Sequence, residues 1–165
     1  MKIEFKKLTE VDKSSIIDLM NNALVRRQMP LLKGEFTKQM CDAFVATKEK
    51  MWEEHGYGPW AFVIEDEFAG WGGIQAEEGE ADLALVLHPD YWGLGKVLYK
   101  KIIHQAFGEM DLDSVIVLFP PSRTRVQGLL RLGFVQEQEL NFGQERFIRY
   151  RLKKSSWTET LKKRI

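Results

Sequence analysis

The stretch that decides the fold is Leu83-Ala84-Leu85-Val86-Leu87-His88-Pro89-Asp90-Tyr91-Trp92-Gly93-Leu94-Gly95-Lys96-Val97-Leu98-Tyr99. Its apolar beginning is typical of a strand, its proline and glycines of a turn, and its last residues of a helix. Backbone N–H groups in such a turn can converge on an anion, and the helix adds roughly half a positive charge at its N-terminus. Glycine also lets the backbone approach phosphate oxygens closely. The stretch therefore predicts a pyrophosphate cradle from Gly93 to Val97.

Two other phosphate-binding motifs fit this stretch poorly. The dinucleotide fingerprint needs a third glycine at position 98, where this sequence has Leu98. The P-loop needs Gly-Lys-Ser or Gly-Lys-Thr after a four-residue gap, and that pattern is absent. Because glycine also serves ordinary turns, a glycine-rich connection that binds nothing stays open as an alternative.

Apolar patterns on both sides of this stretch predict alternating strands and helices. Strands are expected at residues 2–8, 60–64, 68–75, 81–87, 113–119, 134–140 and 145–152, and helices at about 13–24, 34–54, 96–107 and 125–132. Thr9 and Asp12 resemble a capping box before the first helix, and Gly133 is placed to end the last. This order of elements predicts an α/β (α+β) fold.

The length and composition favour one main domain. The chain has 165 residues, of which 44% are hydrophobic, enough for a substantial core. We expect this domain to cover residues 1–152 and residues 153–165 to form a C-terminal tail with a short helix. Cys41 is the only cysteine, which excludes an intramolecular disulfide and a cysteine-rich zinc site.

The charge balance argues against two classes of partner. Twenty-four basic and 24 acidic side chains give a formal net charge of zero, whereas nucleic-acid binders and polybasic membrane-surface proteins carry a basic excess. No window approaches the roughly 18 apolar residues of a membrane span, and residues 1–7 do not resemble a signal peptide. These features predict a cytoplasmic protein with neither a nucleic-acid nor a membrane partner.

A second segment strengthens the interpretation of the glycine turn. It reads Pro121-Ser122-Arg123-Thr124-Arg125-Val126-Gln127-Gly128-Leu129-Leu130-Arg131-Leu132-Gly133-Phe134. Together the two segments resemble the GNAT acetyltransferase family, whose acetyl-CoA motif is Gln/Arg-x-x-Gly-x-Gly/Ala. Trp92-Gly93-Leu94-Gly95-Lys96-Val97 is most similar to the ribosomal-protein N-acetyltransferase branch, which often has Trp-Gly-x-Gly-x-Ala. Leu132-Gly133-Phe134 matches the end of a family helix, while Ser122 and Arg125 replace its Asn and Ser.

This resemblance implies a particular fold and ligand. The sheet would be mixed, mostly antiparallel, flanked by helices and splayed at its central strands. The pantetheine arm of acetyl-CoA would pair with Leu85, Val86 and Leu87 like an extra strand. Its pyrophosphate would lie on the turn, and the amine acceptor would enter from the opposite side. The implied binding residues of the turn and of the second segment are Trp92, Gly93, Leu94, Gly95, Lys96, Val97, Ser122 and Arg125.

The implied reaction is direct attack of a primary amine on the thioester, and the acceptor is either a protein N-terminus or a small-molecule amine. The attacking amine must be neutral. At pH 7, deprotonation costs about 1 kcal/mol for an α-amine and about 4.6 kcal/mol for a lysine side chain. Family members often have an acidic residue early in the central strand, where this sequence has Asp82, with Glu80 as the second choice. Either residue would act as the base, although both also fit solvated acids of a turn.

The departing thiolate needs little protonation because the pKa of a thiol is near 8.5. Many family members have a tyrosine on the later helix for this step, but the matching residue here is Leu129. Ser122 is then a weak candidate, whereas Tyr91 and Tyr99 are expected to pack on the sheet. The backbone N–H after Val86 is a candidate to polarise the thioester carbonyl.

Two alternatives to an acetyltransferase stay open. The changes at positions 122, 125 and 129 also suit a non-catalytic acyl-CoA-binding or sensor module. The other alternative is an unrelated α/β domain with a purely structural glycine turn. His55, His88 and His104 lack the spacing of metal ligands, so no metal site is predicted. Strands within residues 134–152 that stay exposed would allow a homodimer.

Overall fold

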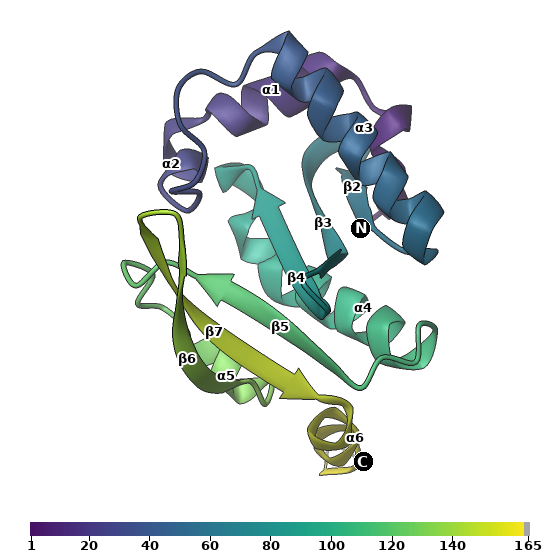
Figure 1. Cartoon of the computed structure of the whole chain (residues 1–165). Coiled ribbons are helices and arrows are strands. Elements are labelled where there is room, and N and C mark those ends of the chain that lie inside the picture. Colours follow the sequence, from purple (N-terminus) through teal and green to yellow (C-terminus); the bar gives the residue numbers. More distant parts are fainter. Residues whose placement is uncertain (164–165) are drawn as a thin grey trace.

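The protein, described by a computed structural model over residues 1–163, has within that range a seven-stranded sheet with helices on both faces (Figure 1). The strand order is β1-β2-β3-β4-β5-β7-β6. Neighbouring strands are antiparallel except for β4 and β5, which are parallel. The predicted mixed, mostly antiparallel sheet is therefore confirmed.

The elements follow the predicted order along the chain. The strands are β1 (Ile3–Lys6), β2 (Pro59–Ile64), β3 (Glu67–Glu77), β4 (Glu80–Leu87), β5 (Ser114–Phe119), β6 (Val135–Phe142) and β7 (Glu145–Lys153). The α-helices are α1 (Lys13–Asn21), α2 (Ala23–Arg26), α3 (Lys38–His55), α4 (Gly95–Gly108), α5 (Gln127–Arg131) and α6 (Lys154–Lys163). Short 3₁₀ turns, η1 (Leu8–Glu10) and η2 (Pro89–Leu94), precede α1 and α4.

The first predicted helix is divided into two by capping side chains. Asp12 caps α1 by accepting a hydrogen bond from the Ser14 N–H at 3.0 Å, so the predicted capping box of Thr9 and Asp12 is wrong. Asn22 ends α1 and begins α2, because its Oδ1 accepts from the N–H groups of Leu24 and Val25. Short polar side chains compete in this way with a continuous helix, which apolar spacing alone does not reveal.

The other helix limits also depend on caps. Helix α3 begins after Thr37, whose hydroxyl accepts from the Met40 N–H at 3.2 Å, and not near Gly34 as predicted. Helix α5 is shorter than expected, and Gly133 follows it with a φ of +106°, in agreement with its predicted place at the helix end. The tail helix α6 follows β7 directly, and residues 164–165 lie outside the described part of the chain.

The sheet splays between its two central strands, as expected. Strands β4 and β5 share one register pair, Asp82 with Ile116, and they diverge beyond it (Figure 1). On its other side β4 pairs with β3 along its whole length. A Cβ placed on Gly72 would lie 2.4 Å from the Ala84 carbonyl oxygen, so a larger residue would push the strands apart. Strand β4 is therefore held firmly by β3 while its opposite edge opens.

Apolar side chains fill a core on each face of the sheet. One core lies under α4 and includes Leu98, Ile102 and Phe107. The other lies under α1 and α3 and includes Ile16 and Cys41, which are fully buried. Successive residues of β4 contribute to opposite faces, because side chains alternate along a strand. In the described residues, no helix combines the length and the apolar character that crossing a membrane requires.

Candidate active site

A cavity of about 680 Å³ occupies the opening between β4 and β5. Its walls come from α2 and the loop after it, from β3 and β4, from the start of α4 and from the loop after β5. Phe142 and Phe147 of the β6–β7 hairpin close another side. The cavity therefore connects the two faces of the sheet at the position where the sequence predicts the site.

The register of β3 and β4 decides which backbone groups of β4 face this opening. The His88 N–H donates to the Ala69 carbonyl at 2.8 Å, so alternate residues back along β4, including Val86, also bond to β3. The backbone groups of Leu85 and Leu87 then point away from β3. The Leu87 carbonyl accepts from the Trp92 indole N–H at 2.9 Å, which leaves the Leu85 groups and the Leu87 N–H for a ligand.

Of the three residues predicted to pair with the pantetheine arm, Leu85, Val86 and Leu87, only Leu85 and Leu87 have free backbone groups. Because the backbone groups of Val86 are used by β3, that residue offers only its side chain. The Leu87 N–H is the group after Val86 that the sequence suggests for polarising a carbonyl. An extended ligand in the opening would add to the free edge of β4 as a strand does.

The predicted cradle forms the end of η2 and the start of α4. Gly95 is the first residue of the 14-residue helix α4, and no side chain caps its first turn. A Cβ built on Gly95 would have nothing closer than the Leu85 Cδ2 at 4.0 Å. Trp92 and Gly95 line the cavity, while Gly93, Leu94, Lys96 and Val97 complete the turn beside it. The open first turn is suited to an anion.

The loop after β5 adds positive charge to the same end of the cavity. Ser122, Arg123 and Arg125 all line the cavity. The guanidinium carbon of Arg123 lies 3.9 Å from the centroid of the Phe119 ring, which it covers as in a cation–π contact. The family resemblance in the sequence indicates Ser122 and Arg125 but not Arg123, which lies between them in the chain. Two arginines that line the same cavity as the open first turn of α4 add positive charge suited to phosphate groups.

Asp82 lies in the cavity at the point where the sheet opens. Burial raises the pKa of Asp82 to about 7; the nearby carboxylate of Glu77 adds to the rise and Lys48 opposes it. A carboxyl group with this pKa is partly ionised at neutral pH and can therefore accept a proton. Asp82 thus stays a candidate for the base.

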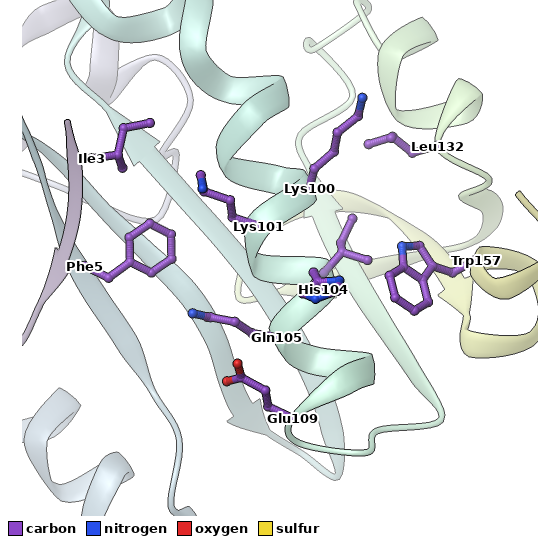
Figure 2. Close-up of a pocket in the computed structure, with 10 residues that line it drawn as sticks. Ile3, Phe5, Lys100, Lys101, His104, Gln105, Glu109, Leu132 and Trp157 are labelled. Carbon is purple, nitrogen blue, oxygen red and sulfur yellow. The ribbon is translucent and has the colours of Figure 1, made fainter. Parts of the chain in front are cut away.

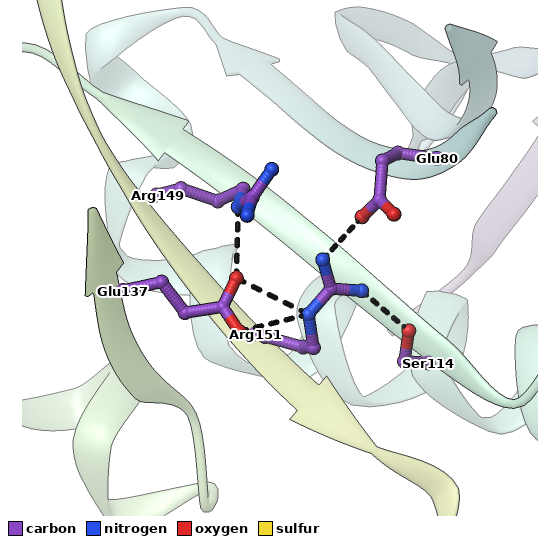
Figure 3. A network of polar contacts seen from close by, with 5 residues as sticks. All are labelled: Glu80, Ser114, Glu137, Arg149 and Arg151. Atoms are coloured by element: carbon purple, nitrogen blue, oxygen red, sulfur yellow. Dashed lines mark hydrogen bonds and ion pairs between the residues drawn. The ribbon is translucent and has the colours of Figure 1, made fainter. Parts of the chain in front are cut away.

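The carboxylate of Glu80, the second candidate for the base, is already paired with an arginine (Figure 3). Its carboxylate accepts a hydrogen bond of 2.6 Å from Arg151 of β7. Arg151 also donates to Ser114 of β5 and to Glu137 of β6, and Arg149 donates to the same Glu137. We call these five residues the Arg151 network. It ties four strands together at the closed end of the opening and leaves Asp82 as the candidate base.

Tyr99 is a cavity residue that the sequence analysis assigned to packing. It packs against the core, as expected, but also lies one turn after Gly95 on the same face of α4. The rise along the helix axis from Gly95 to Tyr99 is about 6 Å, which is about the length of two residues in a strand. Because α4 connects two parallel strands, it runs back along β4, and Tyr99 reaches the level of Asp82. Burial raises the pKa of Tyr99, and Arg123 opposes this rise.

A second cavity, of about 620 Å³, lies on the outer side of α4 (Figure 2). Figure 2 shows Ile3 and Phe5 of β1 on one side of the helix and Trp157 of α6 on the other. Lys100, Lys101 and His104 are exposed on the helix between them. This cavity does not include the residues of the opening between β4 and β5, so it is separate from the site. Among residues 1–163 no group of three or more His, Cys, Asp or Glu side chains could hold a metal ion.

Comparisons with known proteins agree with this geometry. The sequence model of the acetyltransferase (GNAT) domain matches residues 2–135. The GNAT-family acetyltransferase from Bacillus anthracis is similar in structure, with a TM-score of 0.74, 17% identity and coverage of 94% of this chain and 96% of that one. An acetyltransferase from Agrobacterium tumefaciens has a TM-score of 0.74 and 16% identity, with coverage of 91% and 90%.

A third similar structure contains a ligand. It is the spermidine N-acetyltransferase from Vibrio cholerae in complex with CoA and spermine, with a TM-score of 0.68 and 15% identity, covering 94% of this chain and 98% of that one. At this identity the likeness shows a shared fold, whereas the sequence match over residues 2–135 covers most of the chain. The protein belongs to the GNAT family and is an acetyl-CoA-dependent acetyltransferase.

Proposed function

We propose that the protein transfers the acetyl group of acetyl-CoA to a primary amine by direct attack of the amine on the thioester. The observation that carries this proposal is the cavity through the sheet, which has groups suited to an anion at one end and Asp82 at the opposite end. That Vibrio cholerae enzyme, an acetyltransferase of the amine spermidine, adds support at the level of the fold. The ribosomal-protein branch suggested by the sequence stays a prediction.

The residues that would hold acetyl-CoA follow from the geometry of the opening. The free backbone groups of Leu85 and Leu87 would bind its arm, and the first turn of α4 would bind its pyrophosphate. Arg123 and Arg125 would neutralise the remaining phosphate charge. When bound there, acetyl-CoA supplies the activated acetyl group. The Leu87 N–H would then donate to the carbonyl oxygen, on which negative charge develops.

Asp82 would take the proton that the attacking amine must lose. An alkylamine with a pKa near 10.4 is almost fully protonated at pH 7, so a base in contact with it is useful. The carbon–sulfur bond of the thioester breaks as the new carbon–nitrogen bond forms, and the sulfur leaves with the electron pair. A proton must then reach the sulfur, directly from a side chain or from water.

We assign delivery of that proton to Tyr99, because it faces the opening at the level of Asp82. Replacing Tyr99 with Phe is expected to lower kcat about tenfold or more, since proton transfer by a placed side chain contributes at least that much. Steady-state kinetics at neutral pH, where Tyr99 keeps its proton because burial raises its pKa, measure the loss.

Ser122 is the sequence-based candidate for the same proton and provides the comparison. Its hydroxyl also lines the cavity, on the loop after β5. Ser122→Ala should cost less activity than Tyr99→Phe, and the unrelated Tyr57→Phe controls for loss of a phenol. A larger loss of kcat in Ser122→Ala than in Tyr99→Phe would assign the step to Ser122 instead.

A thiol-release assay tests the proposed function as a whole. The protein is incubated with acetyl-CoA and a set of primary amines, and free CoA thiol is measured against time. Turnover that depends on both substrates supports the proposal. The rival, a non-catalytic acyl-CoA-binding module, is suggested by Leu129, which is buried and has no hydroxyl group. It predicts saturable binding of acetyl-CoA without release of thiol.

Several predictions from the sequence complete the proposal. We propose that residues 1–152 form the catalytic domain, that the protein works in the cytoplasm and that nucleic acids are not among its partners. The exposed edge strand β6, where Val135 is 65% exposed, supports the prediction of a homodimer.

A further inference from the structure

The end of the cavity opposite the cradle contains a compact set of charges. Asp82 and Glu77 line the cavity there. Lys48 of α3 lies beside them, with its ammonium 5.3 Å from the centroids of both the Phe44 and the Trp71 rings. The ammonium donates a hydrogen bond to the side chain of Gln75.

The strand register places these groups next to one another. Gln75 is the register partner of Asp82, so both side chains lie on the face of the sheet that α3 covers. Lys48 interacts electrostatically with both carboxylates. Burial lowers the pKa of Lys48, and Glu77 and Asp82 oppose this effect. With all three groups ionised, the set has one excess negative charge, which matches one added ammonium group.

The surroundings of these charges are apolar. Among the described residues that line the cavity, Glu77 and Asp82 are the only carboxylates. Apart from Gln28 and Glu77, the lining residues from α2, the loop after it, β3 and the β6–β7 hairpin are mainly aliphatic and aromatic, and include Val25, Met29, Leu31, Trp71, Phe142 and Phe147. Lys33 and Glu145 form an ion pair of 2.8 Å between the α2–α3 loop and the β6–β7 hairpin, so Glu145 is already neutralised.

A second ammonium group on the acceptor would therefore lack a partner. Transfer of an unpaired charge from water to an apolar wall is costly, whereas an alkyl or aryl group gains free energy there. Lys48 makes the cost larger because its own positive charge repels a second cation. The positive charge of Lys48 thus favours acceptors with one amine group over acceptors with two or more.

We infer that the acceptor is a primary monoamine on an apolar body, and that Lys48 excludes polyamines from the site. This inference rests on the proposed function, since it concerns the amine that Asp82 would deprotonate. It makes the acceptor unlike spermidine, the substrate named for the similar Vibrio cholerae enzyme. Lys48 is a specificity-determining residue in this assignment and takes no part in proton transfer.

The test compares two amines of equal length, hexylamine and 1,6-diaminohexane, in the thiol-release assay. The native protein should have a kcat/KM for hexylamine at least tenfold higher than for the diamine. Lys48→Met keeps a long apolar side chain without the charge and should reduce that ratio about tenfold. Lys48→Arg keeps the charge and should keep the preference for hexylamine.

Lys50→Met is the matched control. Lys50 lies on the same helix, is 72% exposed and pairs with Glu54 on the surface, so its loss should leave the ratio unchanged. Equal or faster turnover of the diamine by the native protein would overturn the inference, even if Lys48→Met failed to fold. A ratio unaffected by Lys48→Met would overturn the role of Lys48. Absence of turnover with every amine would instead refute the proposed function.

Discussion

Asp82→Asn is expected to lower kcat by about 10²-fold or more while changing the affinity for acetyl-CoA less than twofold. The amide keeps the shape of the carboxylate but cannot take a proton from the amine, and a placed base contributes about 10²- to 10⁴-fold. Binding should survive because the groups assigned to acetyl-CoA are the backbone of Leu85 and Leu87, the first turn of α4 and the loop after β5, and none of them is the Asp82 side chain. Steady-state kinetics with hexylamine and calorimetric titration with acetyl-CoA measure the two effects separately.

The pH dependence of kcat/KM provides a second measure of the same role. Since Asp82 must be ionised to act as a base, the rate should rise through about pH 7, where its pKa lies. Asp82→Asn should lose this ionisation and keep only the one that belongs to the amine. Glu80→Gln is the matched control, since Glu80 pairs with Arg151. If the rise in rate near pH 7 were lost in Glu80→Gln and kept in Asp82→Asn, the base would be Glu80 and not Asp82.

The free energy of unfolding should decrease with rising pH over the range in which the reaction rate increases. The pKa of Asp82 is higher in the folded protein, about 7, than its ordinary value of 3.8, so the folded state binds the proton more tightly. The free energy of unfolding therefore decreases as the pH rises from about 4 through 7. Asp82→Asn should remove this decrease and be more stable than the native protein above pH 7, by about 1–3 kcal/mol after allowance for partial exposure. Thermal unfolding from pH 4 to 8 shows the difference.

Gly95→Asp is expected to weaken acetyl-CoA binding by about 10²- to 10³-fold. The new carboxylate would lie at the first turn of α4, where the pyrophosphate is assigned, and like charges about 4 Å apart repel by up to about 4 kcal/mol at an effective dielectric of 20. Folding should be unaffected, because a Cβ at this position meets nothing nearer than 4.0 Å and an acidic residue at a helix N-terminus is favourable. Calorimetric titration measures the affinity, and thermal unfolding without ligand checks the fold.

Gly108→Asp provides the control at the opposite end of the same helix. A Cβ there also meets open space, so the substitution adds the same charge to α4 far from the opening. Its affinity for acetyl-CoA should equal that of the native protein. Unchanged affinity in Gly95→Asp would show that the first turn of α4 does not hold the phosphates.

The elements near the glycine turn could be predicted because their signals are local. The apolar run ending at Leu87, the glycines and the helical spacing after Gly95 each depend on adjacent residues. The structure confirms the strand, the turn and the helix there. Asn22 is also a local signal, but the apolar residues on both sides of it keep the same helical spacing, so the pattern predicts one continuous helix.

The composition of the site depends on contacts between residues far apart in the chain, which a single sequence does not show. Lys48 and Asp82 are 34 positions apart and meet because α3 covers the face to which Asp82 points. Glu80 and Asp82 both lie on that face, and Arg151, which lies 71 residues after Glu80 in the chain, decides which of the two is free. Tyr99 has the spacing of a core residue, and only the opening of the sheet beside it turns that position into a cavity wall.

The Arg151 network also bears on how the two halves of the sheet open in solution. Strands β1–β4 and β5–β7 share a single backbone register pair, while Glu80, Ser114 and Glu137 are fastened by one guanidinium group that is 17% exposed. We therefore expect the halves to form two hydrogen-exchange units, whose amides are protected to different degrees. A ligand that contacted both Leu85 and the loop after β5 would join them into one cooperative unit, so slower exchange in β5 would report that the ligand is bound.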